Sequence, residues 1–191
     1  MLALATNVST GAATGYAIAS DFCRIFKEDM SGLYMLSLML TADRDKAEQC
    51  FSSGLGDSVK ANRVFREWAR SWARRMIIQN AIRMIRPTPE RAGVQTLVPA
   101  GPGGGAKSES NASIAAVLTL PAFERFVFVM SVLERYSDQD CSVLLGCSRR
   151  DVALAKTLAA EHLASFAELS VPGGQSATGV FSQERWLAQS A

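Results

Sequence analysis

Apolar residues recur along the chain at intervals of three and four positions, and alternation of apolar with polar residues is rare. Such spacing is typical of one face of an α-helix. In a first stretch, residues 20–86, five positions mark helical faces: Leu33, Leu36, Leu40, Ala47 and Phe51. A second stretch covers residues 118–168. The pattern predicts an all-α protein.

A segment rich in proline and glycine separates the two helical stretches. It holds four of the six prolines and a GPGGG run, which favours a flexible linker over residues 87–117. We therefore expect two small helical domains, residues 20–86 and 118–168. A loose leader over residues 1–19 and a tail over residues 169–191 complete the predicted organisation.

Capping residues predict several helix ends. In "TADRDKAEQ", either Thr41 or Asp43 suits the first cap of a helix. Ser137 is expected to begin a short helix that Gly146 ends, and Ser148 to begin the next helix. Two helices joined by so short a turn predict a helix-turn-helix in the second domain.

Positive charge is concentrated in residues 60–86, which carry a net charge of +7 in a chain whose total is +2. On a continuous helix, Arg66, Arg70 and Arg74 would share one arc opposite Trp68 and Trp72. Either this is a solvated arginine face over a core, or it binds a polyanion. With one acidic residue in the stretch, the arginines cannot be neutralised locally, which favours an outside anion such as phosphate as their partner. We expect both tryptophans to pack in the core, with base stacking as the alternative.

The sequence gives little indication of metal binding, catalysis or a membrane span. The four cysteines form no CxxC pair and His162 is the single histidine, so no metal or cofactor is expected. The cysteines are expected to be reduced core thiols. No nucleophile–base constellation or apolar run of membrane-spanning length is present, so we expect a cytoplasmic protein that is not an enzyme. Neither a membrane nor a small-molecule substrate is an expected partner.

Three segments together resemble one protein family. "LYMLSLMLTADRDKAEQ", "FREWARSWARR" and "LPAFERFVFVMSVLERYSDQDCSVLLGCSRRDV" are similar, in this order and across a linker, to segments of bacterial RNA polymerase sigma factors of the extracytoplasmic-function class. The resemblance covers roughly residues 22–163. It implies a transcription initiation factor that binds RNA polymerase core and directs promoter recognition. An inhibitory anti-sigma protein is a further candidate partner.

The resemblance also assigns residues. Polymerase contact falls to four positions: Glu48, Gln49, Ser52 and Ser53. DNA contact falls to ten positions: Arg66, Arg70, Arg74, Arg75, Gln79, Arg83, Ser148, Arg149, Arg150 and Lys156.

Two places depart from the family pattern. "AEQCFSSG" has Gln49, Ser52 and Ser53 where the family has acidic and amide side chains, and Gly54 follows. The predicted reading helix has Ala153, Leu154 and Ala155 in place of basic residues. These departures favour an alternative: a sigma-derived protein-interaction module that has lost specific promoter binding.

Overall fold

The structure is a computed structural model that describes residues 15–60, 63–89 and 109–170. Within these residues the chain is helical apart from turns and one isolated antiparallel bridge between Tyr16 and Phe65, which confirms the all-α class. The elements in chain order are α1 (Ala19–Glu28), α2 (Met30–Thr41), α3 (Arg44–Lys60), η1 (Arg66–Trp68), α4 (Ala69–Ile85), α5 (Glu109–Thr119), α6 (Ala122–Phe128), the π-helical turn η2 (Val129–Leu133), α7 (Asp138–Leu145) and α8 (Arg149–Ser170).

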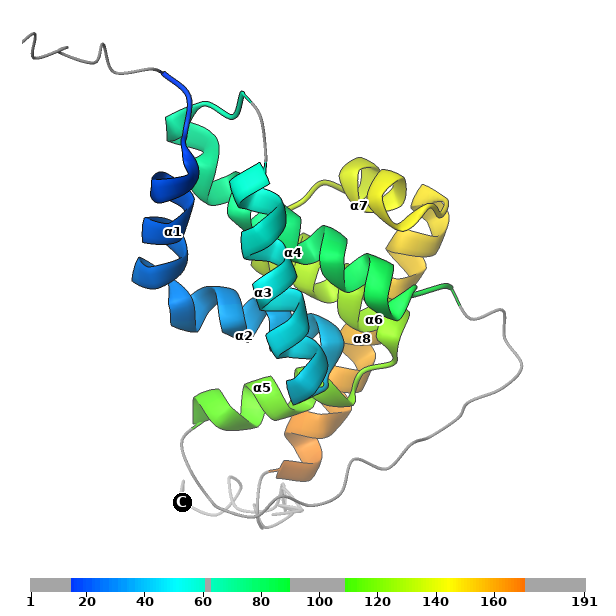
Figure 1. Ribbon diagram of the computed structural model, residues 1–191. Helices are drawn as coiled ribbons and strands as arrows, with labels where there is room; N and C mark the ends of the chain where they lie inside the picture. The colour runs from blue at the N-terminus through cyan, green and yellow to red at the C-terminus, as the bar shows by residue number, and fades with distance from the viewer. Residues whose placement is uncertain (1–14, 61–62, 90–108, 171–191) are drawn as a thin grey trace, which may run out of the picture.

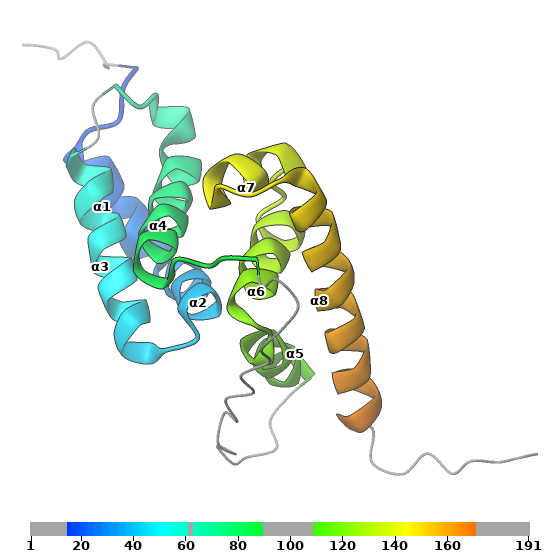
Figure 2. The ribbon, with the colours of Figure 1, turned by 90° about the vertical axis from the view of Figure 1, so that its right-hand side faces the viewer.

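The helices form two groups that lie side by side (Figures 1 and 2). We call α1–α4 the first helical group and α5–α8 the second helical group. Helix α2 contacts α5, α6 and η2 of the second group. Figure 2 shows α7 next to the N-terminal half of α4.

Local capping chemistry sets the helix ends that the sequence predicts. The Asp43 carboxylate accepts from the Lys46 amide at 2.9 Å, which settles the cap of α3 in favour of Asp43. Ser137 Oγ accepts from the Asp140 amide at 3.1 Å and begins α7. Gly146, with φ of 66°, ends it, and Ser148 caps α8. These helix boundaries are confirmed.

The basic stretch is not one continuous helix, contrary to the prediction. Helix α3 ends at Lys60, Arg63 has φ of 62°, and α4 begins only at Ala69. Between them the chain turns and pairs with the segment before α1: the Ala17 amide donates to Val64 O at 2.7 Å. Residues 15–18 are therefore held in place, although the sequence predicted a loose leader through residue 19. This contact joins the start of α1 to the start of α4.

The predicted linker is shorter than expected at its C-terminal end. Helix α5 already begins at Glu109, within the predicted linker of residues 87–117. Its Ala116 and Val117 are buried, and Leu120 follows in the core. Burial of these apolar side chains stabilises a helix where composition alone indicated a loop. Most of the proline- and glycine-rich segment, and the tail from residue 171, lie outside the described residues.

One hydrophobic core serves both helical groups. Its members include Leu36 and Leu40 of α2 together with Phe126 and Met130 of the second group. The groups also meet through Arg125, whose guanidinium donates to Leu40 O at 3.4 Å and to Leu120 O at 2.7 Å. Those oxygens belong to carbonyls at the C-terminal ends of α2 and α5, which lack partners within their own helices. Burial lowers the pKa of Arg125 to about 10, so it remains charged at neutral pH.

Candidate functional site

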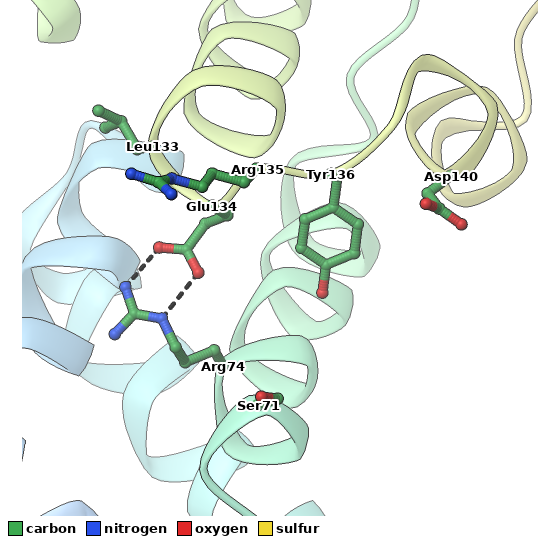
Figure 3. Close-up of a pocket in the computed structure, with 7 residues that line it drawn as sticks. All are labelled: Ser71, Arg74, Leu133, Glu134, Arg135, Tyr136 and Asp140. Carbon is green, nitrogen blue, oxygen red and sulfur yellow. Dashed lines mark hydrogen bonds and ion pairs between the residues drawn. The ribbon is translucent and has the colours of Figure 1, made fainter. Parts of the chain in front are cut away.

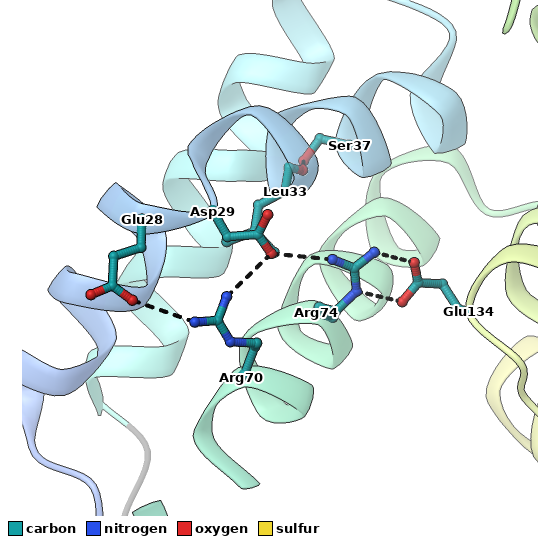
Figure 4. Close-up of polar contacts among 7 residues, drawn as sticks. All are labelled: Glu28, Asp29, Leu33, Ser37, Arg70, Arg74 and Glu134. Carbon is teal, nitrogen blue, oxygen red and sulfur yellow. Dashed lines mark hydrogen bonds and ion pairs between the residues drawn. The ribbon is translucent and has the colours of Figure 1, made fainter. Parts of the chain in front are cut away.

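The first stripe of predicted DNA-binding arginines lies along η1 and α4 and faces α1. Arg66 Nε lies 3.2 Å from an Asp21 carboxylate oxygen, and Arg70 Nη2 lies 3.4 Å from Glu28 Oε2. Figure 4 shows Arg70 reaching toward both Glu28 and Asp29. The basic stretch itself holds only one acidic residue, Glu67. The partners of these arginines come from a helix distant in sequence, which a count of charges within the stretch misses.

Arg66 and Arg70 nevertheless stay accessible to an external anion. Their side chains keep 46% and 55% of their surface exposed. The Glu28 side chain is 47% exposed, so water competes for both charges of the Arg70–Glu28 pair and that pair contributes little to stability. The phosphates of a nucleic-acid backbone can therefore displace the Glu28 carboxylate from Arg70 at small cost.

Arg74 differs because it bridges the two helical groups. Its Nη1 lies 3.4 Å from Asp29 Oδ2, while its Nε donates to Glu134 Oε2 at 2.7 Å and its Nη2 to Glu134 Oε1. The Glu134 side chain is only 8% exposed. The hydrogen bonds with Glu134 raise the pKa of Arg74 above its ordinary value.

The second stripe lies on another side of α4. Arg83 Nη2 donates to Asp57 Oδ2 at 2.7 Å, and the Asn80 amide donates to the same oxygen at 3.0 Å. The bonds from Asn80 and Arg83 hold the pKa of Asp57 below its usual value. Arg75 and Gln79 are half-buried. The structure thus ties part of this stripe to α3, with the Arg83 side chain still 62% exposed.

An exposed aromatic cluster lies beside the first arginine stripe. Tyr16 stacks on Phe65 with ring centroids 4.9 Å apart, and Phe65 meets Trp68 edge to face at 5.2 Å. Trp68 is 59% exposed, Tyr16 42% and Phe65 40%. The prediction that Trp68 packs in the core is wrong, since the break before α4 turns it outward. Trp72 is half-buried against the core as expected.

The aromatic cluster was missed because the helical wheel assumed an unbroken helix. No proline or glycine lies between Asp57 and Trp68 to signal the break. The segment around Tyr16, which pairs with the chain before α4, lies in the predicted leader.

Helices α7 and α8 are joined by a turn over residues 146–148, and both ends of that turn carry capping residues. Arg149 and Arg150 are exposed at the start of α8, and Ser148 is exposed before it. Lys156 pairs with Asp138 at 3.0 Å and keeps 41% of its side chain exposed.

The apolar residues of the predicted reading helix divide between core and surface. Ala155 is buried, whereas Ala153 and Leu154 face solvent, and Leu154 is 59% exposed. A side chain this apolar offers no hydrogen bond to a base edge. It gives α8 an apolar surface beside Arg149 and Arg150.

The predicted polymerase-binding residues share the outer face of α3. Glu48, Gln49, Ser52 and Ser53 are all exposed. Gly54, next to them, is buried against Ile77 of α4. The glycine therefore permits close packing of α3 on α4 and leaves the neighbouring polar face free.

A cleft of about 520 Å³ lies where the second helical group meets α4. Figure 3 shows Arg74 and Ser71 on one wall, with Glu134, Arg135 and Tyr136 on the other. Asp140 of α7 completes the lining. The cleft places two basic and two acidic side chains together, with no net charge.

Metal and membrane features do not emerge from the described residues. Among them, no group of three or more histidine, cysteine or acidic side chains is arranged to hold a metal ion. None of the helices there has the length and apolar character needed to cross a membrane. Cys50 and Cys141 are buried as expected, but Cys23 is exposed on α1, contrary to the prediction of a core thiol.

Comparison with known proteins yields little. No protein-family model and no curated protein matches the sequence. A chain of the co-crystal structure of the sigma factor RpoE in complex with the anti-sigma factor NepR from Bartonella quintana is similar in fold, with a TM-score of 0.46 and 16% identity. The alignment covers 80% of this chain and 99% of that chain.

Proposed function

We propose that the chain is a sigma-factor-like transcription initiation factor, which binds RNA polymerase core through α3 and promoter DNA through the surface at the start of α4. It acts in the cytoplasm by binding and not by catalysis. An inhibitory protein of the anti-sigma type is a further partner. The sequence resemblance supplies the class of function.

The exposed aromatic cluster of Tyr16, Phe65 and Trp68 carries the nucleic-acid part of the proposal. Aromatic side chains that project beside arginines suit single-stranded nucleic acid, because bases stack on the rings while cations meet the backbone. Arg66 and Arg70 flank the cluster and are about half exposed. Such a surface favours an unpaired strand over an intact duplex. Melted promoter DNA would present such an unpaired strand.

The polymerase part of the proposal rests on the outer face of α3. Glu48 is exposed there and forms none of the described ion pairs. Gln49, Ser52 and Ser53 beside it are uncharged, so electrostatic attraction to a basic partner surface depends chiefly on Glu48.

Binding to a labelled single-stranded oligonucleotide, followed by fluorescence anisotropy over a range of salt concentrations, tests the nucleic-acid surface. We expect Trp68→Ala to weaken binding about tenfold, the loss of roughly one stacked base. Arg70→Ala should reduce the salt dependence by about 0.7 in the log–log slope, the value for one phosphate contact on a single strand. Leu154→Ala is the matched control, since Leu154 is equally exposed but lies on α8. If Trp68→Ala and Leu154→Ala bind alike, the aromatic cluster is not a stacking site.

Co-elution with core RNA polymerase on a sizing column tests the α3 surface. Glu48→Lys should abolish co-elution, because it reverses the one charge among the four residues of the proposed contact. Glu161→Lys makes the same charge change at an exposed position on α8, away from α3, and should leave it intact. Equal loss in both variants would point to net charge instead of a specific contact.

A second candidate function is a protein-interaction module. Exposed Leu154 on α8 and exposed Val143 on α7 favour it, because apolar side chains at the surface of a helix pair suit a protein partner. In this case a protein captured by the chain should be lost with Leu154→Ala and kept with Trp68→Ala, the reverse of the result expected for single-stranded DNA.

A further inference from the structure

The segment 133–136 of the second helical group lies directly against α4. It begins at Leu133, the last residue of the π-helical turn η2, and contains Arg135, whose φ of 58° turns the chain sharply before α7. A residue other than glycine in this conformation is uncommon and strained. The turn directs Glu134 onto α4, where Figure 4 shows its carboxylate facing the Arg74 guanidinium.

Arg74 and Glu134 join α4 to the second helical group through two charge-assisted hydrogen bonds. Both carboxylate oxygens of Glu134 accept from one guanidinium, an arrangement that is stronger and more directional than a single bond. Because the Glu134 side chain is 8% exposed, removal of Arg74 would leave a nearly buried charge without its partner. By contrast, the pairs of Arg66 and Arg70 stay within the first helical group, and that of Arg70 with Glu28 joins two exposed side chains.

The same segment also shields Arg75. Burial raises the pKa of the neighbouring Tyr136, and both the charge of Arg75 and a hydrogen bond between the Tyr136 and Arg75 side chains oppose this rise. Arg75 is half-buried, and the Arg74 side chain is 31% exposed. Two of the arginines predicted to meet DNA are therefore covered by the second helical group, while Arg66 and Arg70 are open.

We propose that segment 133–136 is a latch, held by the bidentate pair of Glu134 and Arg74, that masks Arg74 and Arg75 from nucleic acid until it is displaced. This inference rests on the proposed function. A phosphate group fits the guanidinium fork as a carboxylate does, so the backbone of a bound strand competes with Glu134 for Arg74. Arg66 and Arg70 make the first contact, and displacement of Glu134 then extends the surface along α4.

The latch moves locally, without separation of the two helical groups. The apolar core between α2 and α6, together with Arg125, still joins the groups when Glu134 leaves. The turn at Arg135 is the natural pivot, because its strained backbone is released by movement. The cleft lined by Ser71 and Asp140 leaves space at this edge.

Glu134→Gln tests the latch on the full-length chain, with Glu28→Gln as its matched control. Each variant removes one carboxylate that faces an α4 arginine, but Glu28 belongs to the first helical group and pairs with exposed Arg70. Amide hydrogen exchange over residues 133–140 should rise about tenfold in Glu134→Gln and stay unchanged in Glu28→Gln, as expected when one charge-assisted bond is lost. Affinity for a single-stranded oligonucleotide should rise about five- to tenfold in Glu134→Gln and less than threefold in Glu28→Gln.

Each result has a defined meaning. Unchanged exchange over residues 133–140 in Glu134→Gln overturns the latch. Raised exchange with no more gain in affinity than Glu28→Gln overturns the masking of Arg74 and Arg75. If neither the original chain nor either variant binds the oligonucleotide, the proposed function fails, whereas the exchange result still decides whether the latch exists. Glu134→Asp, whose shorter carboxylate cannot reach both nitrogens, repeats the comparison if Glu134→Gln does not fold.

Discussion

Because α3 packs closely on α4, we expect alanine to have opposite effects on stability at two glycines that lie two residues apart in α3. Gly54 is buried, and a Cβ placed on it would lie 2.8 Å from Ile77 Cγ1 and 3.4 Å from the Ile77 Cα and N atoms. A Cβ placed on Gly56 would meet nothing within 4 Å. The matched changes are therefore Gly54→Ala and Gly56→Ala.

The magnitudes follow from two competing effects. Alanine is favoured over glycine inside a helix by about 0.8–1 kcal/mol, and this gain applies at both positions. At Gly54 it is opposed by overpacking, which costs about 1–3 kcal/mol in a well-packed core. Ile77 is fully buried and its backbone belongs to α4, so it has little freedom to retreat. We expect Gly54→Ala to lower the free energy of unfolding by about 1 kcal/mol and Gly56→Ala to raise it by about 0.5–1 kcal/mol.

Urea unfolding followed by far-ultraviolet circular dichroism measures both changes in the full chain. The original chain is the reference, and the unfolding midpoint should move in opposite directions in the two variants. If Gly54→Ala stabilises the protein as much as Gly56→Ala, then α3 and α4 do not approach as closely as described and the reasoning is refuted.

Two further predictions concern buried groups. Arg125→Met should lower the free energy of unfolding by about 1–3 kcal/mol, because it leaves the Leu40 and Leu120 carbonyls without a donor; an unchanged urea midpoint would show that the guanidinium does not tie α2 to the second group. Burial raises the pKa of Cys50 and Cys141 from about 9 to about 11, so a maleimide at pH 8 should label exposed Cys23 much faster than either of them. Unfolded thiols lose their protons near pH 9, whereas the buried thiols of the folded chain hold them until about pH 11. The free energy of unfolding should therefore be unaffected by these thiols below pH 9 and fall as the pH rises toward 11. Equal labelling of the three thiols, or a urea midpoint that stays constant from pH 8 to 10.5, would contradict this account.

Helix ends were predictable wherever a single side chain and its own backbone decide them. Asp43, Ser137 and Ser148 each accept a hydrogen bond from an amide three residues later, and Gly146 supplies the left-handed turn between α7 and α8. These interactions depend on a few neighbouring residues, so the local sequence contains them.

The candidate site was less predictable, because its geometry comes from contacts between distant segments. The break before α4 is stabilised by the pairing of residues 15–17 with residues 64–66, and it turns Trp68 toward solvent. A helical wheel over residues 60–86 assumes that the break does not exist. The acidic partners of Arg66 and Arg70 lie on α1, more than 40 residues earlier in the chain.

By itself the sequence determined the all-α class, the capping of α3, α7 and α8 and the concentration of positive charge in residues 60–86. Each follows from composition or from interactions within one turn of helix. Only the tertiary structure decided which arginines are open and which are covered, where the aromatic cluster faces, and how the second helical group meets α4. Those outcomes depend on packing between elements that are distant in the sequence. The Glu134 carboxylate, for example, binds Arg74, which is 60 residues away, and no local sequence pattern predicts such a contact.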